Sequence, residues 1–158
     1  MANNTREVIG RIRGWQQRVH HLAGRLEDLE WESYEVPGEE QAQVIHSRLC
    51  ALREFLEMHF EQELALVTDL CQLAGGHHPE LNASLEMIKR NQQHITRNLG
   101  KTLSVWSEAP THDESHYQLA VLLHSWEQHS EHVQRAIRLK FPTFPSYQKS
   151  VWRYGART

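Results

Sequence analysis

The sequence predicts an all-α protein, an up-down-up-down antiparallel four-helix bundle with a short aromatic and basic C-terminal tail. Apolar residues recur at helical spacing through four long segments, and no segment shows the alternation of a β-strand. Glycine, proline and capping residues separate the segments at short intervals, as they do between antiparallel helices of one bundle. A chain of 158 residues suits one such domain. We assign residues 1–142 to the bundle and 143–158 to the tail.

The first helix is expected from Asn4 or Thr5 to Glu32, because Asn4 and Glu7 have the spacing of a capping box. Its apolar positions follow one another in steps of four and three, which is typical of a helix that packs in a bundle. These positions are Val8, Ile12, Trp15, Val19, Leu22, Leu26 and Leu29.

The second helix is expected from Glu39 to Leu73, between Pro37-Gly38 and the pair Gly75-Gly76. Its apolar residues predict the buried face of the helix. They are Val44, Leu52, Phe55, Leu56, Leu66, Val67, Leu70 and Leu73.

The third helix is expected at about residues 80–107, and the fourth from a capping residue at Thr111 to about Lys140. Proline at positions 110, 142 and 145 marks their ends. The inward residues of the third helix are Leu81, Leu85, Ile88, Ile95, Leu99, Leu103 and Trp106, and those of the fourth are Leu119, Leu122, Leu123, Trp126, Val133 and Ile137.

Composition excludes several classes of function. The formal charge of −3 gives no basic field for nucleic acid, and no apolar run is long enough for a membrane span or a secretory signal. Cys50 and Cys71 lie on one predicted helix and cannot bridge within the chain, which favours a reducing compartment. We therefore expect a cytoplasmic protein with no nucleic-acid or membrane partner.

The tail has two interpretations. It combines aromatic and basic residues, and it could pack as a strap across the bundle. Aromatic and Arg residues are also enriched at interfaces, so the tail could dock another protein or a second copy of the chain. The candidate interaction residues are Tyr147, Trp152, Arg153 and Tyr154.

His59 and Glu63 lie near the centre of the apolar face of the second helix. Burial of a titratable pair without partners costs several kcal/mol, so these residues need either a metal ion or a closed polar network. Residues four apart on a helix lie on the same face and can reach one ion together.

The stretch Met58–Glu63, flanked by Leu52, Leu56 and Leu66, resembles the second helix of the hemerythrin-like (HHE cation-binding) family. The resemblance in helix order and length covers about residues 5–142, and it includes Lys140-Phe141-Pro142 at the end of the last helix. It implies a di-iron centre held by a His from the first and third helices and by His-x-x-x-Glu from the second and fourth.

Carried onto this sequence, the family's other ligand positions fall on Val19, Gln92, Trp126 and Ser130. Only His59 and Glu63 therefore keep the chemistry of metal ligands. His20 and His94 are expected to face outward, which leaves His129 as a further metal ligand. No cofactor is favoured, and iron is the alternative.

The favoured interpretation is a metal-free polar layer of His59, Glu63, Gln92, Trp126 and Ser130. In it Glu63 accepts a hydrogen bond from His59, and the other residues supply further partners.

The resemblance then suggests a hemerythrin-like bundle with a degenerate metal centre, acting as a binding, sensor or accessory module. The alternative is a mono- or di-iron protein that binds dioxygen, nitric oxide or iron. We favour a non-enzyme, because the sequence lacks phosphate-loop and nucleophile motifs.

Overall fold

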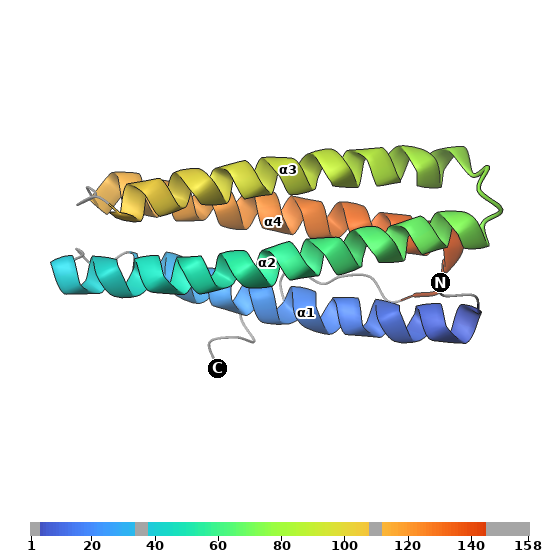
Figure 1. Cartoon of the computed structure of the whole chain (residues 1–158), viewed down its shortest axis with the longest axis horizontal. Coiled ribbons are helices and arrows are strands. Elements are labelled where there is room, and N and C mark those ends of the chain that lie inside the picture. The colour runs from blue at the N-terminus through green and yellow to red at the C-terminus, as the bar shows by residue number, and fades with distance from the viewer. Residues whose placement is uncertain (1–3, 34–37, 108–111, 145–158) are drawn as a thin grey trace.

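The computed structural model describes residues 4–33, 38–107 and 112–144. Four helices make up nearly all of this part: α1 (Thr5–Glu32), α2 (Glu39–Leu73), α3 (Pro79–Ser107) and α4 (His112–Lys140). Figure 1 shows them running alternately in opposite directions, and each packs mainly against its neighbours in sequence, with α4 closing against α1. The predicted four-helix bundle is confirmed.

The helix ends follow from the sequence. The side chain of Asn4 accepts a hydrogen bond from the backbone N–H of Glu7 at 2.8 Å, so the predicted cap of α1 is present. After α2, Gly75 and Gly76 have φ angles of 85° and 76°, which are favourable only for glycine. The Gly76 N–H donates to the Cys71 carbonyl at 2.9 Å and so closes the end of the helix.

Parts of the sequence-based assignment lie outside the described residues. They include the cap at Thr111 and all four candidate interaction residues of the tail, Tyr147, Trp152, Arg153 and Tyr154. The helix that precedes the tail ends at Lys140, as expected. In the part of the chain that is described, no helix is long and apolar enough to cross a membrane.

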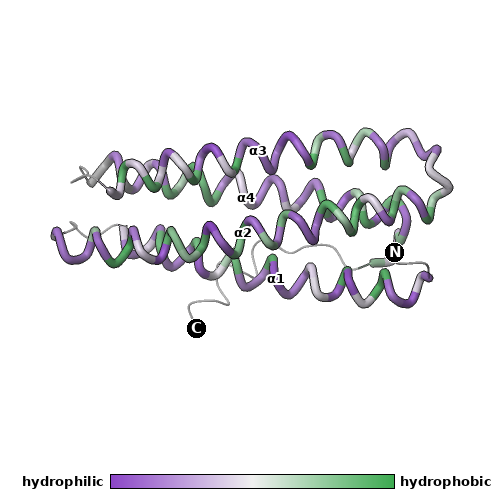
Figure 2. The backbone as a smooth tube through the Cα atoms, in the orientation of Figure 1, coloured by the Kyte–Doolittle hydropathy of each residue, from purple (hydrophilic) through white to green (hydrophobic). Residues whose placement is uncertain are grey.

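The core is built from one apolar stripe of each helix, and Figure 2 shows these stripes as short green segments between purple ones. On α2 the prediction was partly wrong. Val44 and Phe55 were expected to face inward, but they are 40% and 45% exposed. Ile45 and Leu49 are fully buried and complete the inward face, because they lie nearer the direction of Leu52 and Leu56.

The difference between the two faces of α2 can be measured. Leu49→Ala should lower the free energy of unfolding by about 2–5 kcal/mol, because it leaves a cavity in the core. Val44→Ala should cost less than about 1 kcal/mol, since Val44 is largely exposed. Urea denaturation of both variants checks this, and equal losses of stability would contradict the assignment of the faces.

Candidate functional site

The centre of the bundle holds a buried carboxylate. Glu63 is 0% exposed and His59 is 1% exposed, and both project from the inward face of α2. The helix brings them together because residues four apart lie one turn apart on the same side. The apolar residues on this face of α2 pack into the core and bury the face. Glu63 and His59 must therefore find hydrogen-bond partners inside the protein.

Each of the four helices sends one nitrogen donor to the Glu63 carboxylate. Oε2 accepts from Trp15 Nε1 of α1 at 2.7 Å and from His59 Nε2 of α2 at 3.0 Å. Oε1 accepts from Gln92 Nε2 of α3 at 3.0 Å and from His129 Nε2 of α4. Each oxygen therefore has two donors, which fills the four acceptor positions of a carboxylate.

These contacts keep Glu63 ionised. Burial by itself raises the pKa of Glu63, but the charge and hydrogen bond of His129, followed by the hydrogen bond of His59, lower it further than burial raises it. The net result is a pKa well below the ordinary value of a glutamate. A carboxylate that accepts several N–H bonds is favoured over its protonated form, so the layer holds a buried negative charge.

Arg18 fixes the protonation of His59. Its Nε donates to His59 Nδ1 at 3.3 Å, so Nδ1 must be the unprotonated nitrogen of the ring. His59 Nε2 then carries the proton that Glu63 accepts, and the imidazole is neutral. The pKa of Arg18 is lowered overall, chiefly by burial, and the charge of Glu63 acts in the opposite direction by favouring the guanidinium cation.

An aromatic shell surrounds the layer. The Phe60 ring lies 5.4 Å from that of His129 and 6.2 Å from that of Trp126, and the His59 and Trp126 rings lie 5.3 Å apart. These are ordinary separations for packed rings. The packed rings exclude water from around the Glu63 carboxylate and fix the orientation of the His59 and His129 imidazoles.

Two expected members of the layer do not contact Glu63. The Ser130 hydroxyl donates to the Trp126 carbonyl at 3.0 Å within its own helix. Among the described residues, neither Trp126 Nε1 nor His129 Nδ1 has a hydrogen-bond partner, although both are buried. The expectation that Trp126 and Ser130 supply partners to this carboxylate is therefore wrong: the Ser130 hydroxyl bonds within its own helix, and Trp126 Nε1 has no acceptor in the described part of the chain.

The structure thus brings together His59, Glu63, Gln92 and His129 from the sequence-based candidates. Sequence reasoning missed Trp15 and Arg18, which supply the indole donor and the balancing cation. It also took Val19 as the position nearest the layer on α1, whereas Trp15, one turn earlier on the same seam, reaches Glu63 instead.

The residues present do not fit the di-iron centre that the resemblance implies. Val19 and Trp126 offer no metal ligand, and the two imidazoles donate to different oxygens of Glu63. Within the described ranges, no group of three or more His, Cys, Asp or Glu side chains is placed to hold a metal ion. Comparisons with protein-family models, with curated proteins and with solved structures give no match.

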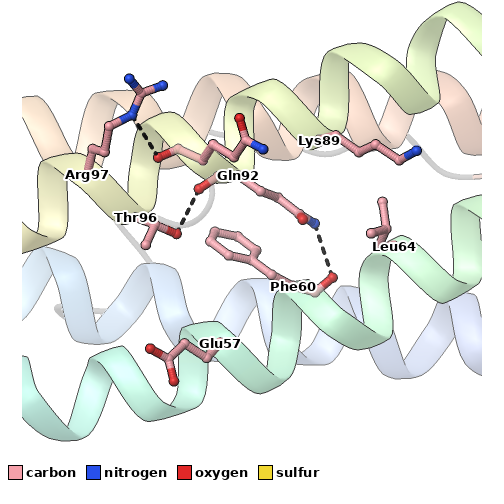
Figure 3. Close-up of a pocket in the computed structure, with 8 residues that line it drawn as sticks. Glu57, Phe60, Leu64, Lys89, Gln92, Thr96 and Arg97 are labelled. Atoms are coloured by element: carbon pink, nitrogen blue, oxygen red, sulfur yellow. Dashed lines mark hydrogen bonds between the residues drawn. The ribbon is translucent and has the colours of Figure 1, made fainter.

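A groove of about 700 Å³ lies beside the layer, between α2 and α3 (Figure 3). Phe60 and Gln92 belong to both. The Gln92 amide donates to the Phe60 carbonyl at 3.1 Å as well as to Glu63, so this one side chain connects the groove to the buried carboxylate. The groove is lined by Glu57, Phe60, Leu64, Lys89, Gln92, Gln93, Thr96 and Arg97.

The lowered pKa of Glu63 predicts a specific pH dependence of stability. The unfolded chain binds the Glu63 proton more tightly than the folded chain does. Ionised Glu63 therefore contributes its full stabilisation above the pKa of glutamate in the unfolded chain, about 4.3, and this contribution is lost progressively as the pH falls below that value. Glu63→Gln should cost about 3 kcal/mol at pH 7, because the neutral amide cannot replace the ion for all four donors. Melting temperatures from pH 7 to pH 3 should converge for the two proteins. A constant difference across this range would contradict the ionised state of Glu63.

The Trp15 hydrogen bond can be tested against a matched residue. Trp15→Phe and Trp126→Phe each replace a buried indole with a smaller phenyl ring. Only Trp15→Phe also removes a hydrogen bond to a charged partner, Glu63. We expect Trp15→Phe to be the more destabilising variant by about 1.5–3 kcal/mol. Chemical denaturation measures the difference, and equal effects would show that the indole N–H of Trp15 contributes nothing.

Proposed function

We propose that this chain is a hemerythrin-like bundle in which a closed hydrogen-bond layer stands in place of the metal centre, and that it acts as a non-enzymatic binding, sensor or accessory module. The observation that carries the proposal is the Glu63 carboxylate with its four donors. A carboxylate that already accepts four N–H bonds has no lone pair free for a metal ion.

The layer has a clear structural use in such a module. Because its donors come from all four helices, any axial slip of one helix would break a bond to a buried charge. Buried polar networks of this kind can fix register even where they add little stability. A rigid bundle with a fixed register is suited to presenting binding surfaces on its outer faces.

The groove between α2 and α3 supports the sensor form of the proposal. Its volume falls within the range of small-molecule sites, and it combines an apolar floor with a few polar groups. A ligand there would contact Gln92 and Phe60, both of which also touch the layer. A ligand bound in the groove would thus alter the hydrogen bonding around the Glu63 carboxylate.

A second candidate is an iron protein that binds dioxygen, nitric oxide or iron. One observation favours it: His129 as well as His59 reaches Glu63, so three residues with ligand chemistry meet in one layer. Metal binding would require Trp15 and Gln92 to give up their bonds to the carboxylate.

Metal analysis separates the two candidates. Protein purified from cells grown with added iron should contain well under one iron per chain and lack the near-ultraviolet absorption of an oxo-bridged pair. Added Fe²⁺ or Zn²⁺ should leave the melting temperature unchanged, whereas a site at 100 times its dissociation constant would add about 2.7 kcal/mol. Two irons per chain, or stoichiometric iron lost in His59→Ala, would overturn the proposed function in favour of the iron protein.

A further inference from the structure

A pocket of about 370 Å³ lies between α1 and α2, and it shares no residue with the polar layer. Its lining on α1 runs from Arg25 to Glu32, which is about 10 Å along a helix. Two guanidinium groups and two carboxylates surround it, and the fifth lining residue, Leu29, is only 3% exposed. The charged residues are Arg25, Asp28, Glu32 and Arg48. The pocket therefore presents both signs of charge and carries no net charge.

One pair of these charges is already joined. Arg48 Nη1 of α2 donates to Glu32 Oε1 of α1. The second oxygen of this carboxylate, Oε2, is buried and has no hydrogen-bond partner in the part of the chain that is described. A buried carboxylate oxygen without a donor costs free energy. Glu32 would therefore be stabilised by an N–H group that enters the pocket.

The other two charges lie near each other but are not paired. Arg25 and Asp28 are three residues apart on α1, a spacing at which opposite charges commonly form an ion pair. Instead, the guanidinium of Arg25 lies over the Phe55 ring, with its central carbon 4.9 Å from the ring centre. Among the described residues, Asp28 has no hydrogen-bond or ion-pair partner, and Arg25 has no acidic one. The contact with Phe55 uses the face of the guanidinium and leaves the N–H donors at its edge available.

This arrangement of charges selects the class of ligand. An anion would be repelled by the two carboxylates, and a metal ion would be repelled by the two guanidinium groups. A zwitterion with an ammonium and a carboxylate on one carbon atom matches both halves of the lining. Residues three or four apart on a helix have Cβ atoms about 5–6 Å apart, which leaves room for such a head group between Arg25 and Asp28. The volume of the pocket is also at the lower end of the range for small-molecule sites, about 300–1,000 Å³.

We propose that this pocket binds a free α-amino acid. The carboxylate of the amino acid accepts hydrogen bonds from the edge of Arg25, and its ammonium donates to Asp28 and to Oε2 of Glu32. Phe55 holds the guanidinium of Arg25 in place for this contact. The site names a ligand for the binding module proposed above and rests on that role.

The site and the proposed function fail separately. A chain that holds no iron and does not bind an amino acid would refute the site alone. Stoichiometric iron in a chain that binds an amino acid would refute the proposed function alone.

NMR titration of the full chain with L-alanine tests the site and its selectivity. Propionate is alanine without the ammonium, and ethylamine is alanine without the carboxylate. At equal ionic strength, L-alanine should cause saturating shifts of the backbone amides of residues 25–32. Both analogues should bind at least about 10-fold more weakly, because each loses the charge-assisted hydrogen bonds of one side. No saturating shift with L-alanine, or equal affinity for either analogue, would overturn the proposal.

Variants test the position of the site. Arg25→Gln and Asp28→Asn should each raise the dissociation constant for L-alanine by at least about 10-fold. Arg13→Gln and Glu54→Gln are the matched controls, because both residues are exposed and lie outside the pocket. Far-ultraviolet circular dichroism verifies that all four variants fold. Equal weakening by the controls, or unchanged binding in Arg25→Gln and Asp28→Asn, would also overturn the proposal.

Discussion

The ionised carboxylate of Glu63, buried at the centre of the bundle, is the constraint on which the rest of the structure depends. A buried charge without partners is too costly for a domain of ordinary stability, so the surroundings must supply donors. Trp15, His59, Gln92 and His129 do so, one from each helix. The same contacts set the relative heights of the four helices, which makes the polar layer part of the architecture as well as the candidate site.

Compensation of the charge extends beyond direct contacts. Arg18 brings a positive charge to the far side of His59 and thereby determines which ring nitrogen carries the proton. The aromatic shell excludes water and strengthens these interactions through its low polarity. It also leaves Trp126 Nε1 and His129 Nδ1 buried without a partner in the described part of the chain, at a cost of about 1–3 kcal/mol for an unmet donor. The layer is therefore satisfied around Glu63 and less complete on its α4 side.

Helix number, order and ends could be predicted because they depend on apolar period and on capping residues such as Asn4, which act locally. The burial of Glu63 could also be predicted from its place on the apolar face. Its partners could not all be found, since which side chain reaches across a bundle depends on helix rotation and rotamer. Trp15 was taken as a core residue only, because an indole contributes to an apolar seam whether or not its N–H is used. Phe55 was assigned to the core for a related reason: hydrophobicity alone does not distinguish an inner face from an outer stripe.

In the function that we propose, the layer around Glu63 holds the helices in register, and the outer faces of the bundle are the binding surfaces. The most direct test of a metal-free hydrogen-bond layer around Glu63 is ¹⁵N-edited NMR of the indole and imidazole protons during addition of Fe²⁺ or Zn²⁺. We expect a slowly exchanging Trp15 indole proton and an Nε2-protonated, neutral His59, neither of which changes when metal is added. Loss of the Nε2 proton of His59 or His129 together with stoichiometric metal uptake would contradict it.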